Sequence, residues 1–192
     1  MRSMLGRRLW HVSTGLCIVA AAWLLPKTTF LLSLGAVTFL FLAFELVRLR
    51  ASSVNRWFCW HFGSLLRQEE VSHLTTSSYV LIAALVAYLA FGRDIAVLSV
   101  CFLAVGDVAA GIVGWHMGRT KLLGKALEGD LACLVSCLAT GFLLHYVGLN
   151  VGLVTIAAGA LGATIGQAVS GPVDDNLTLP LLAGVAMAVV PP

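Results

Sequence analysis

Residues 105–132, VGDVAAGIVGWHMGRTKLLGKALEGDLA, place one carboxylate, Asp107, inside an apolar run and follow it with a dense group of basic and acidic residues. An ionisable side chain near the middle of a membrane-spanning helix is energetically costly, so it almost always faces a protein interior or a wet cavity. We therefore expect Asp107 at the floor of a pocket that faces the cytoplasm, as a general base or a metal ligand. A buried Asp that only bonds a neighbouring helix is the structural alternative.

The rest of the chain has the composition of an integral membrane protein. Hydrophobic residues make up 59% of its 192 residues and charged residues only 11%, which leaves too little polar surface to cover a water-soluble globule. A helix needs about 20 apolar residues to cross the hydrocarbon core. We predict an all-α, polytopic protein with a single domain over residues 1–192 and about seven transmembrane helices, near residues 9–25, 28–47, 77–92, 94–116, 130–148, 150–169 and 177–191.

The basic residues set the predicted orientation, because Lys and Arg near span ends mark the cytoplasmic side. With the N-terminus in the cytoplasm, all of the 12 Lys and Arg residues except Lys27 and Arg93 lie on that side. Among the acidic residues only Asp94 falls outside, and the outer turns are as short as PK, GRD and LN. We therefore expect the chemistry of this protein at the cytoplasmic face of the cell membrane.

The joint after the second span contains RWFCWHFGSLLR, residues 56–67, in which aromatic and basic side chains alternate closely. This mixture is typical of an amphipathic helix that lies in the headgroup layer. An interfacial structural role and a lipid gate both remain open for this segment.

The helix that carries Asp107 also has small residues at i, i+4 steps, which let another helix approach closely. This stripe of small residues consists of Gly106, Ala110, Gly114 and Gly118. Asp107 and Gly111 form a second row beside it.

The polar segment after this helix offers three cations suited to phosphate, Arg119, Lys121 and Lys125, and two acids, Glu128 and Asp130. Its glycine and lysine spacing does not fit a P-loop, and no strand precedes it. A solvated basic joint, with the acids at the N-terminus of the next helix, is the structural alternative.

The segment SGPVDDN places Asp174, Asp175 and Asn176 on the same predicted side of the membrane. These residues either cap the last helix or form, with the cations, a magnesium and polyphosphate site. Hard oxygen ligands and a divalent ion are what phosphoryl transfer needs. Nucleic acid is not an expected partner, because the basic residues follow the membrane boundary and no RNA or DNA module is present.

Together, four segments resemble the family of dolichol kinase, phytol kinase and CTP-dependent diacylglycerol kinase. They cover most of the chain in the expected order: RRLWHVSTG (7–15), FELVRLR (44–50), GDVAAGIVGWHMGRTKLLGKALEGDLA (106–132) and VDDNLTLPL (173–181). The resemblance implies an enzyme that transfers the γ-phosphate of CTP to the hydroxyl of a membrane lipid alcohol, with Mg²⁺ as cofactor. The alcohol would be a polyprenol such as dolichol, a phytol-type alcohol or diacylglycerol.

The early motifs of this family match individual positions of the chain. Arg8 and His11 match its opening basic and aromatic motif, and Glu45 and Arg48 match a Glu-Leu-x-Arg element. Asp107 matches the family's membrane Asp.

The later motifs match with some departures. Lys125, Glu128 and Gly129 match a Gly-Lys-Ser-x-Glu-Gly element, and residues 174–176 with Pro180 match an Asp-Asn-x-Thr-x-Pro element. The departures are Ala126 in place of Ser, Asp130 where Ser or Thr is common, and Gln167 where Glu is expected.

The resulting hypothesis gives the acids and Lys125 the catalytic and metal-binding roles. Asp107 would orient or deprotonate the alcohol, with Lys125 and Glu128 as further catalytic residues. Asp174, Asp175 and Glu128 would hold Mg²⁺.

The cations would neutralise the phosphates of the nucleoside triphosphate, through Arg119, Lys121 and Lys125. Further contacts to the nucleotide or to the substrate headgroup are expected from Asn176, Arg8 and His11. For Arg8 and His11, a role as simple interfacial anchors fits the sequence equally well.

Two rival functions remain open at this point. A cytidylyltransferase that makes a CDP-lipid from a lipid phosphate and CTP would use similar metal and phosphate groups. A small transporter would use Asp107 as a proton or cation site, but the sequence shows no inverted repeat. The identity of the lipid alcohol, the choice between CTP and ATP, and a homo-oligomeric state are not decided by the sequence.

Overall fold

Helices form nearly all of the regular structure. The computed structural model describes residues 2–169 and 173–190, with side chains from residue 6 onward. Two 3-10 turns, η1 (Gly63–Leu65) and η2 (Glu69–Val71), lie in the joint before α4, and a π turn, η3 (Leu103–Asp107), joins α5 to α6. The other elements are α1 (Arg2–Leu24), α2 (Lys27–Arg50), α3 (Ser52–Phe62), α4 (Thr76–Phe91), α5 (Arg93–Phe102), α6 (Val108–Met117), β1 (Lys121–Leu122), β2 (Lys125–Ala126), α7 (Leu127–Tyr146), α8 (Leu153–Val169) and α9 (Asp175–Ala188).

The predicted spans correspond in order to α1, α2, α4, the continuous helix Arg93–Met117, α7, α8 and α9. Within the described residues, three helices are long and apolar enough to cross a membrane: α2, Arg93–Met117 and α7. The helices α4, α8 and α9 are apolar but shorter. The all-α prediction is confirmed, whereas the number of spans and their orientation stay predictions. The predicted last span also includes residue 191, which lies outside the described residues.

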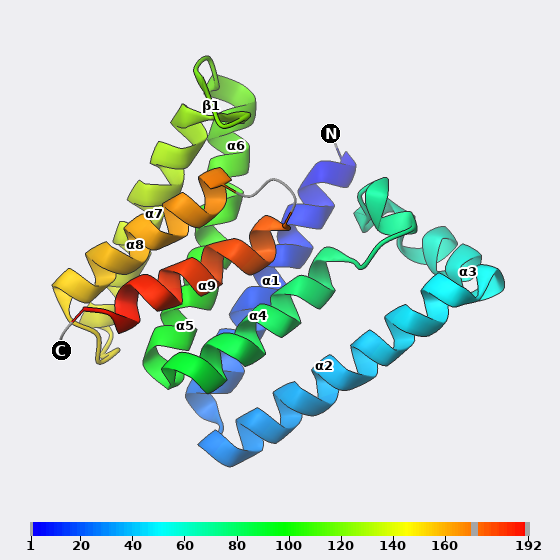
Figure 1. Cartoon of the computed structure of the whole chain (residues 1–192), viewed down its shortest axis with the longest axis horizontal. Coiled ribbons are helices and arrows are strands. Elements are labelled where there is room, and N and C mark those ends of the chain that lie inside the picture. The colour runs from blue at the N-terminus through cyan, green and yellow to red at the C-terminus, as the bar shows by residue number, and fades with distance from the viewer. Residues whose placement is uncertain (1, 170–172, 191–192) are drawn as a thin grey trace.

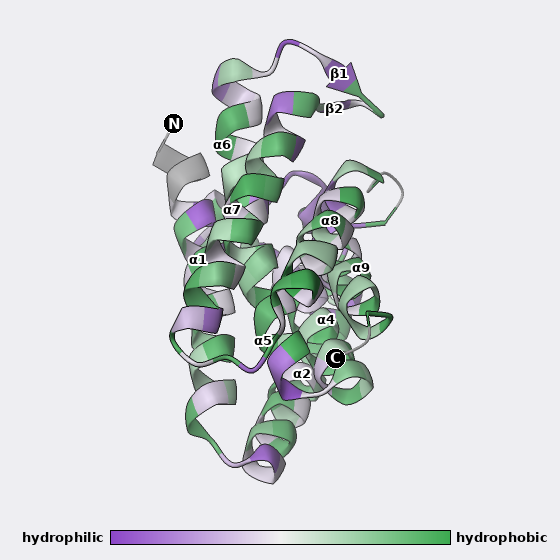
Figure 2. Ribbon diagram, turned by 90° about the vertical axis from the view of Figure 1, so that its left-hand side faces the viewer, coloured by the Kyte–Doolittle hydropathy of each residue, from purple (hydrophilic) through white to green (hydrophobic). Residues whose placement is uncertain are grey.

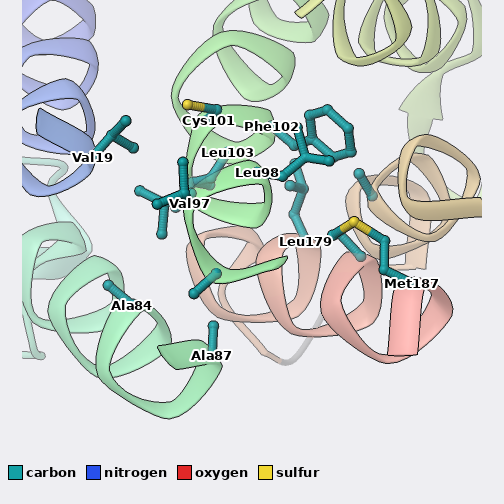
Figure 3. Close-up of a cluster of buried hydrophobic side chains, with 14 of the residues drawn as sticks. Val19, Ala84, Ala87, Val97, Leu98, Cys101, Phe102, Leu103, Leu179 and Met187 are labelled. Atoms are coloured by element: carbon teal, nitrogen blue, oxygen red, sulfur yellow. The ribbon is translucent and has the colours of Figure 1, made fainter. Parts of the chain in front are cut away.

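The centre of the packing is α5. Residues 96–102 are all buried, and the helix packs against α1, α4, α7, α8 and α9. Its residues Leu98 and Phe102 share one apolar cluster with Leu179 and Met187 of α9 (Figure 3). A helix that is apolar on all sides belongs in the interior of a protein, so the other helices are arranged around this one.

The predicted small-residue stripe is the contact surface for α7. A Cβ atom added to Gly106 would lie 2.7 Å from Cys137 Sγ, and one added to Gly129 would lie 2.8 Å from the carbonyl oxygen of Ala110. The two helices therefore pack so closely that only glycine fits at these positions.

A π turn interrupts the continuous helix at its centre. It covers η3 and ends at Asp107, and the helix continues as α6. Single π turns inside α-helices occur frequently at functional sites. This turn was not predicted from the sequence.

A buried ion pair anchors the joint between α2 and α4. Glu45 and Arg48, one turn apart on α2, have no exposed surface, and their two hydrogen bonds are 2.9 and 3.0 Å long. Arg48 also donates to the carbonyl oxygens of Glu70 and His73, at 3.0 and 2.7 Å. The backbone N–H of Thr75 donates to Glu45 at 3.0 Å. The pair therefore ties the returning chain to the end of α2.

The predicted amphipathic segment, residues 56–67, is α-helical only as far as the end of α3 at Phe62, and η1 follows it. Phe58 is buried, and the guanidinium carbon of Arg48 lies 5.1 Å from the centre of its ring. On the other side of the helix, Trp57 and Trp60 are exposed. One side of α3 thus holds the joint in place, while its location in the headgroup layer stays a prediction.

Within the joint, Glu70 fastens the chain to the start of α4. The carboxylate accepts hydrogen bonds from the backbone N–H groups of Arg67 and Thr76, at 2.7 and 2.8 Å, and from the Thr76 hydroxyl. It thereby satisfies one of the N–H groups that a helix N-terminus leaves free. The carboxylate of Glu70 is therefore a structural cap.

The polar segment after α6 forms an antiparallel hairpin, in which Lys121 pairs with Ala126 and Leu122 with Lys125. The turn residues Leu123 and Gly124 have φ values of 52° and 88°. Two positive φ values are what a tight hairpin turn requires. This hairpin was not predicted from the sequence, which lacks the usual Asn-Gly or Asp-Gly turn signal here.

The hydrophilic segments gather toward one end of the bundle. The N-terminus, the joint after α3 and the hairpin lie toward the upper edge of Figure 1, and the turns α1–α2, α4–α5 and α7–α8 lie in its lower half. Hydrophobic residues cover most of the helices, whereas hydrophilic ones concentrate at the hairpin and at helix ends (Figure 2). The start of α1 and the hairpin, two of the segments that carry candidate residues, therefore lie toward the same end of the molecule.

We predict that Glu45→Gln lowers the free energy of unfolding by about 3–5 kcal/mol, because the variant leaves the Arg48 charge buried without its partner. Thermal unfolding of the purified protein in detergent measures the effect. Arg50→Gln, which changes an exposed cation on the same helix, is the matched control and should unfold like the unmodified protein. Equal stability of the two variants would contradict the anchoring role of the pair.

Candidate functional site

A cavity of about 390 Å³ lies between α1, the joint, α4, η3 and α9. Its charged lining residues and its histidine are Arg7, Arg8 and His11 of α1, Arg67 and Glu70 of the joint, and Asp107 of η3. Ligand pockets commonly combine an apolar lining with a few convergent polar groups. The larger apolar residues that line this cavity are Trp10, Phe41, Phe58, Phe62, Leu65, Leu66 and Val80.

Asp107 reaches this cavity from the π turn and is half-buried. Its Oδ2 atom lies 3.8 Å from Nε2 of His11. It also lies within electrostatic range of Asp175, Arg67 and Lys125. The expectation that Asp107 lines a pocket is thus met by the geometry, while its catalytic role stays a prediction.

Arg8 and His11 lie on the side of α1 that meets the second row of the small-residue stripe. Arg8 Nη2 donates to the carbonyl oxygen of Gly111 at 2.9 Å. His11 is buried and lines the cavity. Both residues therefore face the protein interior beside Asp107.

Next to the cavity, Asp174 and Asp175 form a cluster with two cations. The guanidinium of Arg67 lies 3.6 Å from Asp174 Oδ2 and 3.9 Å from Asp175 Oδ1. Lys125 Nζ lies 3.2 Å from Asp175 Oδ2 and donates to the carbonyl oxygen of Gln167 at 2.6 Å. The joint, the hairpin, the end of α8 and the start of α9 therefore meet at this cluster.

The acid cluster and the cavity meet at two residues. Asn176 is buried and lines the cavity, and its side-chain N–H group donates to Asp174 and Asp175. Arg67 lines the cavity as well and contacts both acids. A ligand in the cavity would therefore lie directly beside the acid cluster.

The remaining candidates lie apart from this centre. Arg119 and Lys121 are exposed and are not among the described residues that line the cavity. Glu128 accepts hydrogen bonds from the backbone N–H of Thr120, at 3.1 and 3.4 Å. Of the three cations proposed for phosphate, only Lys125 is in the acid cluster.

The residues present suit a magnesium ion in part. Asp174 and Asp175 supply carboxylate oxygens, and Mg²⁺ is commonly held by one or two carboxylates together with substrate phosphates. In the parts of the chain that the structure describes, no three His, Cys, Asp or Glu side chains form a metal-binding group. Glu128 is therefore not placed with the pair, and its role as a metal ligand stays a prediction.

Three further site residues were not singled out by sequence reasoning: Arg7, Arg67 and Glu70. Arg67 belongs to the amphipathic joint, where contact with lipid headgroups already explains a basic residue. It is far from Asp174 and Asp175 along the chain, so the sequence does not indicate that these residues meet. Arg7 and Glu70 each stand beside another residue of like charge, Arg8 and Glu69, and the sequence does not tell which of the two faces inward.

No family model matches the chain, and no solved structure matches it. The chain is 25% identical to the uncharacterized protein RP860 of Rickettsia prowazekii over 183 residues, which cover 91% of this chain and 88% of that protein. It is 30% identical to CTP-dependent diacylglycerol kinase 1 of Eremothecium gossypii over 97 residues, which cover 49% of this chain and 31% of the kinase. The chain is thus similar over about half its length to part of a lipid kinase.

If Asp174 and Asp175 bind the magnesium of a nucleotide, either Asp→Asn change should raise the Mg²⁺ concentration needed for half-maximal activity. We expect at least about a tenfold increase, because even residues behind metal ligands contribute that much to affinity. Asp174→Asn preserves the cap, in which the side chain of residue 174 accepts a 2.9 Å hydrogen bond from the backbone N–H of Asn176. Magnesium titrations of phosphoryl transfer measure the effect, with Glu69→Gln as the control. Activity that falls only with the amount of folded protein, at unchanged Mg²⁺ dependence, would leave the pair as a helix cap.

Proposed function

We propose that this protein is an integral membrane kinase that transfers the γ-phosphate of CTP to the hydroxyl of a membrane lipid alcohol. The observation that carries the proposal is the junction at Arg67 and Asn176, where an amphipathic cavity adjoins a cluster of acids and cations. Phosphoryl transfer depends mostly on positioning and on charge stabilisation, so donor and acceptor sites have to be adjacent. The partial similarity to a CTP-dependent diacylglycerol kinase supports the same class of reaction.

The cavity is the proposed acceptor site. A lipid alcohol has an apolar body and one small polar group, and the cavity offers an aromatic and aliphatic lining with Asp107 among its polar groups. With the hydroxyl beside Asp107, the carboxylate orients the attacking oxygen and accepts its proton as the oxygen bonds to the γ-phosphorus. The bond between the γ-phosphorus and the bridging oxygen of CTP breaks, and CDP leaves.

The acid cluster is the proposed donor site. Lys125 and Arg67 would neutralise phosphate charge, and Asp174 and Asp175 would hold Mg²⁺. When bound, the ion would supply further charge neutralisation to the phosphates. The exposed hairpin cations Arg119 and Lys121 would reach the nucleotide from the solvent side.

The membrane arrangement is part of the proposal. The apolar helices would form seven spans with the N-terminus in the cytoplasm, which places the cavity and the acid cluster at the cytoplasmic face of the cell membrane. The nucleotide would then arrive from water and the alcohol from the bilayer.

One experiment tests the function and separates it from CDP-lipid synthesis. Purified protein is given diacylglycerol, a polyprenol or a phytol-like alcohol with CTP or ATP labelled at the α- or the γ-phosphate. The proposal expects label from the γ-position of CTP in the lipid product. Label from the α-position, with a lipid phosphate as acceptor, would instead establish a cytidylyltransferase. Absence of lipid labelling with every combination would refute both enzymes.

Asp107→Asn should reduce phosphoryl transfer by at least about 10²-fold, the usual scale for the loss of a positioned acid or base. The variant removes a charge but keeps the size of the side chain, so the fold should persist, and Mg·CTP should bind within a few-fold of normal. Asp94→Asn, near the opposite end of the same continuous helix, is the matched control and should retain activity. Near-normal turnover of folded Asp107→Asn would assign Asp107 a structural role.

A further inference from the structure

His11 has a buried side-chain nitrogen without a hydrogen-bond partner. The residue is only 8% exposed and lines the cavity, and its Nε2 atom makes no hydrogen bond among the described residues. Buried polar atoms are nearly always paired in native proteins, and an exception is often explained by a catalytic role. The surroundings of this nitrogen therefore indicate what it can do.

The carboxylate beside this nitrogen is that of Asp107. Among the described residues it is the acid within ion-pair distance of His11, with Oδ2 3.8 Å from Nε2, which is too far for a hydrogen bond. A proton passes between two such groups when they approach to about 2.6–3.2 Å, and catalytic hydrogen bonds of a free enzyme often shorten to this range only after the substrate binds. A small rotation of either side chain would close the gap.

Two further charged residues of α1 line the cavity, Arg7 and Arg8. Arg8 is held by its hydrogen bond to the carbonyl oxygen of Gly111. Arg7 is repelled by Arg67 and attracted by three acids, which are Glu70, Asp107 and Asp175. A guanidinium has no acceptor atom and stays protonated in proteins, so neither arginine can take a proton from Asp107.

The charged groups on the elements packed against α1 do not compete for this proton. In the joint, Glu70 already accepts hydrogen bonds on both oxygens, and Arg67 lies beside the acid cluster. Helix α4 contains no charged residue. At the opposite end of α1, Arg93 of α5 bonds to the last turn of α1, and on α2 the buried residues Glu45 and Arg48 pair with each other.

The chemistry of the proposed reaction leaves a proton on Asp107 once the hydroxyl oxygen has bonded to phosphorus. An imidazole is a stronger base than a carboxylate by a factor of about 10² or more. A neutral imidazole beside Asp107 therefore offers the proton a more stable location. The transferred phosphoryl group also adds negative charge to the cavity, and a nearby negative charge favours the protonated form of an imidazole.

We infer that His11 is the proton acceptor that regenerates Asp107 in each turnover. The inference rests on the proposed function and replaces the headgroup or nucleotide contact expected for His11 from the sequence. The alcohol proton first bonds to Oδ2 of Asp107. The bond between Oδ2 and this proton then breaks as the proton bonds to the lone pair of Nε2, which leaves a carboxylate beside an imidazolium. The imidazolium releases its proton to water after the phosphorylated lipid leaves.

The test compares the pH dependence of phosphoryl transfer in the unmodified protein and in His11→Gln, with γ-labelled CTP and a lipid alcohol. In the unmodified protein kcat should fall at low pH, because an imidazole that is already protonated accepts no proton. In His11→Gln kcat at neutral pH should fall at least about tenfold, since positioned proton-transfer groups contribute that much or more. The loss of activity on the acidic side should move to lower pH, because the weaker base Asp107 remains as the only acceptor of the pair.

A second variant, His11→Ala, tests the same role by chemical rescue. It removes the imidazole beside a cavity of about 390 Å³, which leaves room for a small base. Added imidazole should raise its kcat at least about tenfold, and the rescue should increase with pH as more of the added imidazole becomes neutral. His116→Gln is the matched control, because His116 is an exposed histidine on the same continuous helix as Asp107 and does not line the cavity. It should keep the rate and pH dependence of the unmodified protein and show no response to imidazole.

The outcomes separate this role from the function itself. Transfer by His11→Gln with a lower kcat but an unshifted acidic side would assign His11 a packing role and overturn the inference, while the kinase stands. If His11→Gln does not fold, failure of imidazole to rescue folded His11→Ala would overturn it in the same way. Absence of transfer by the unmodified protein would overturn the kinase and the role of His11 together.

Discussion

The cavity depends on the buried ion pair between Glu45 and Arg48. Two charges without any exposed surface are stable only when their hydrogen bonds are almost fully satisfied, and here the partners come from the joint that returns from α2 to α4. The same joint supplies Phe58, Phe62 and Arg67 to the cavity. The position of one cavity wall is therefore set by electrostatics at the end of a single helix.

The second organising feature is the meeting of distant segments at the acid cluster. Arg67 precedes α5 in the sequence and Lys125 follows it, and both contact Asp175 at the start of α9. Under the proposed function, the cations that neutralise these acids in the free protein would pair with incoming phosphates without a large rearrangement. Such preorganisation lowers the cost of charge development at the reacting group.

The sequence predicted the class of the fold and one centre of the site. An ionisable residue in an apolar run, Asp107, and the glycines beside it have few alternative explanations, and the structure places them at a cavity and at a close helix contact. The partners of these residues were beyond sequence reasoning. Arg67 and Asp174 are separated by more than half of the chain, and only the packed helices bring them together. The hairpin also escaped prediction, because Leu123 adopts a positive φ value that its residue type disfavours.

The π turn at η3 has a consequence for the phase of the whole helix. A π turn accommodates one residue more than an α-helical turn does, and each residue of an α-helix rotates the following side chains by about 100°. Deletion of one residue within Leu103–Asp107 would therefore regularise the helix but turn α6 relative to α5. Asp107 and Gly111 would rotate away from α1, and Gly114 would rotate away from α7. The π turn thus sets the rotation of α6 relative to α5. With this rotation, the continuous helix presents an apolar surface at one end and a polar site at the other.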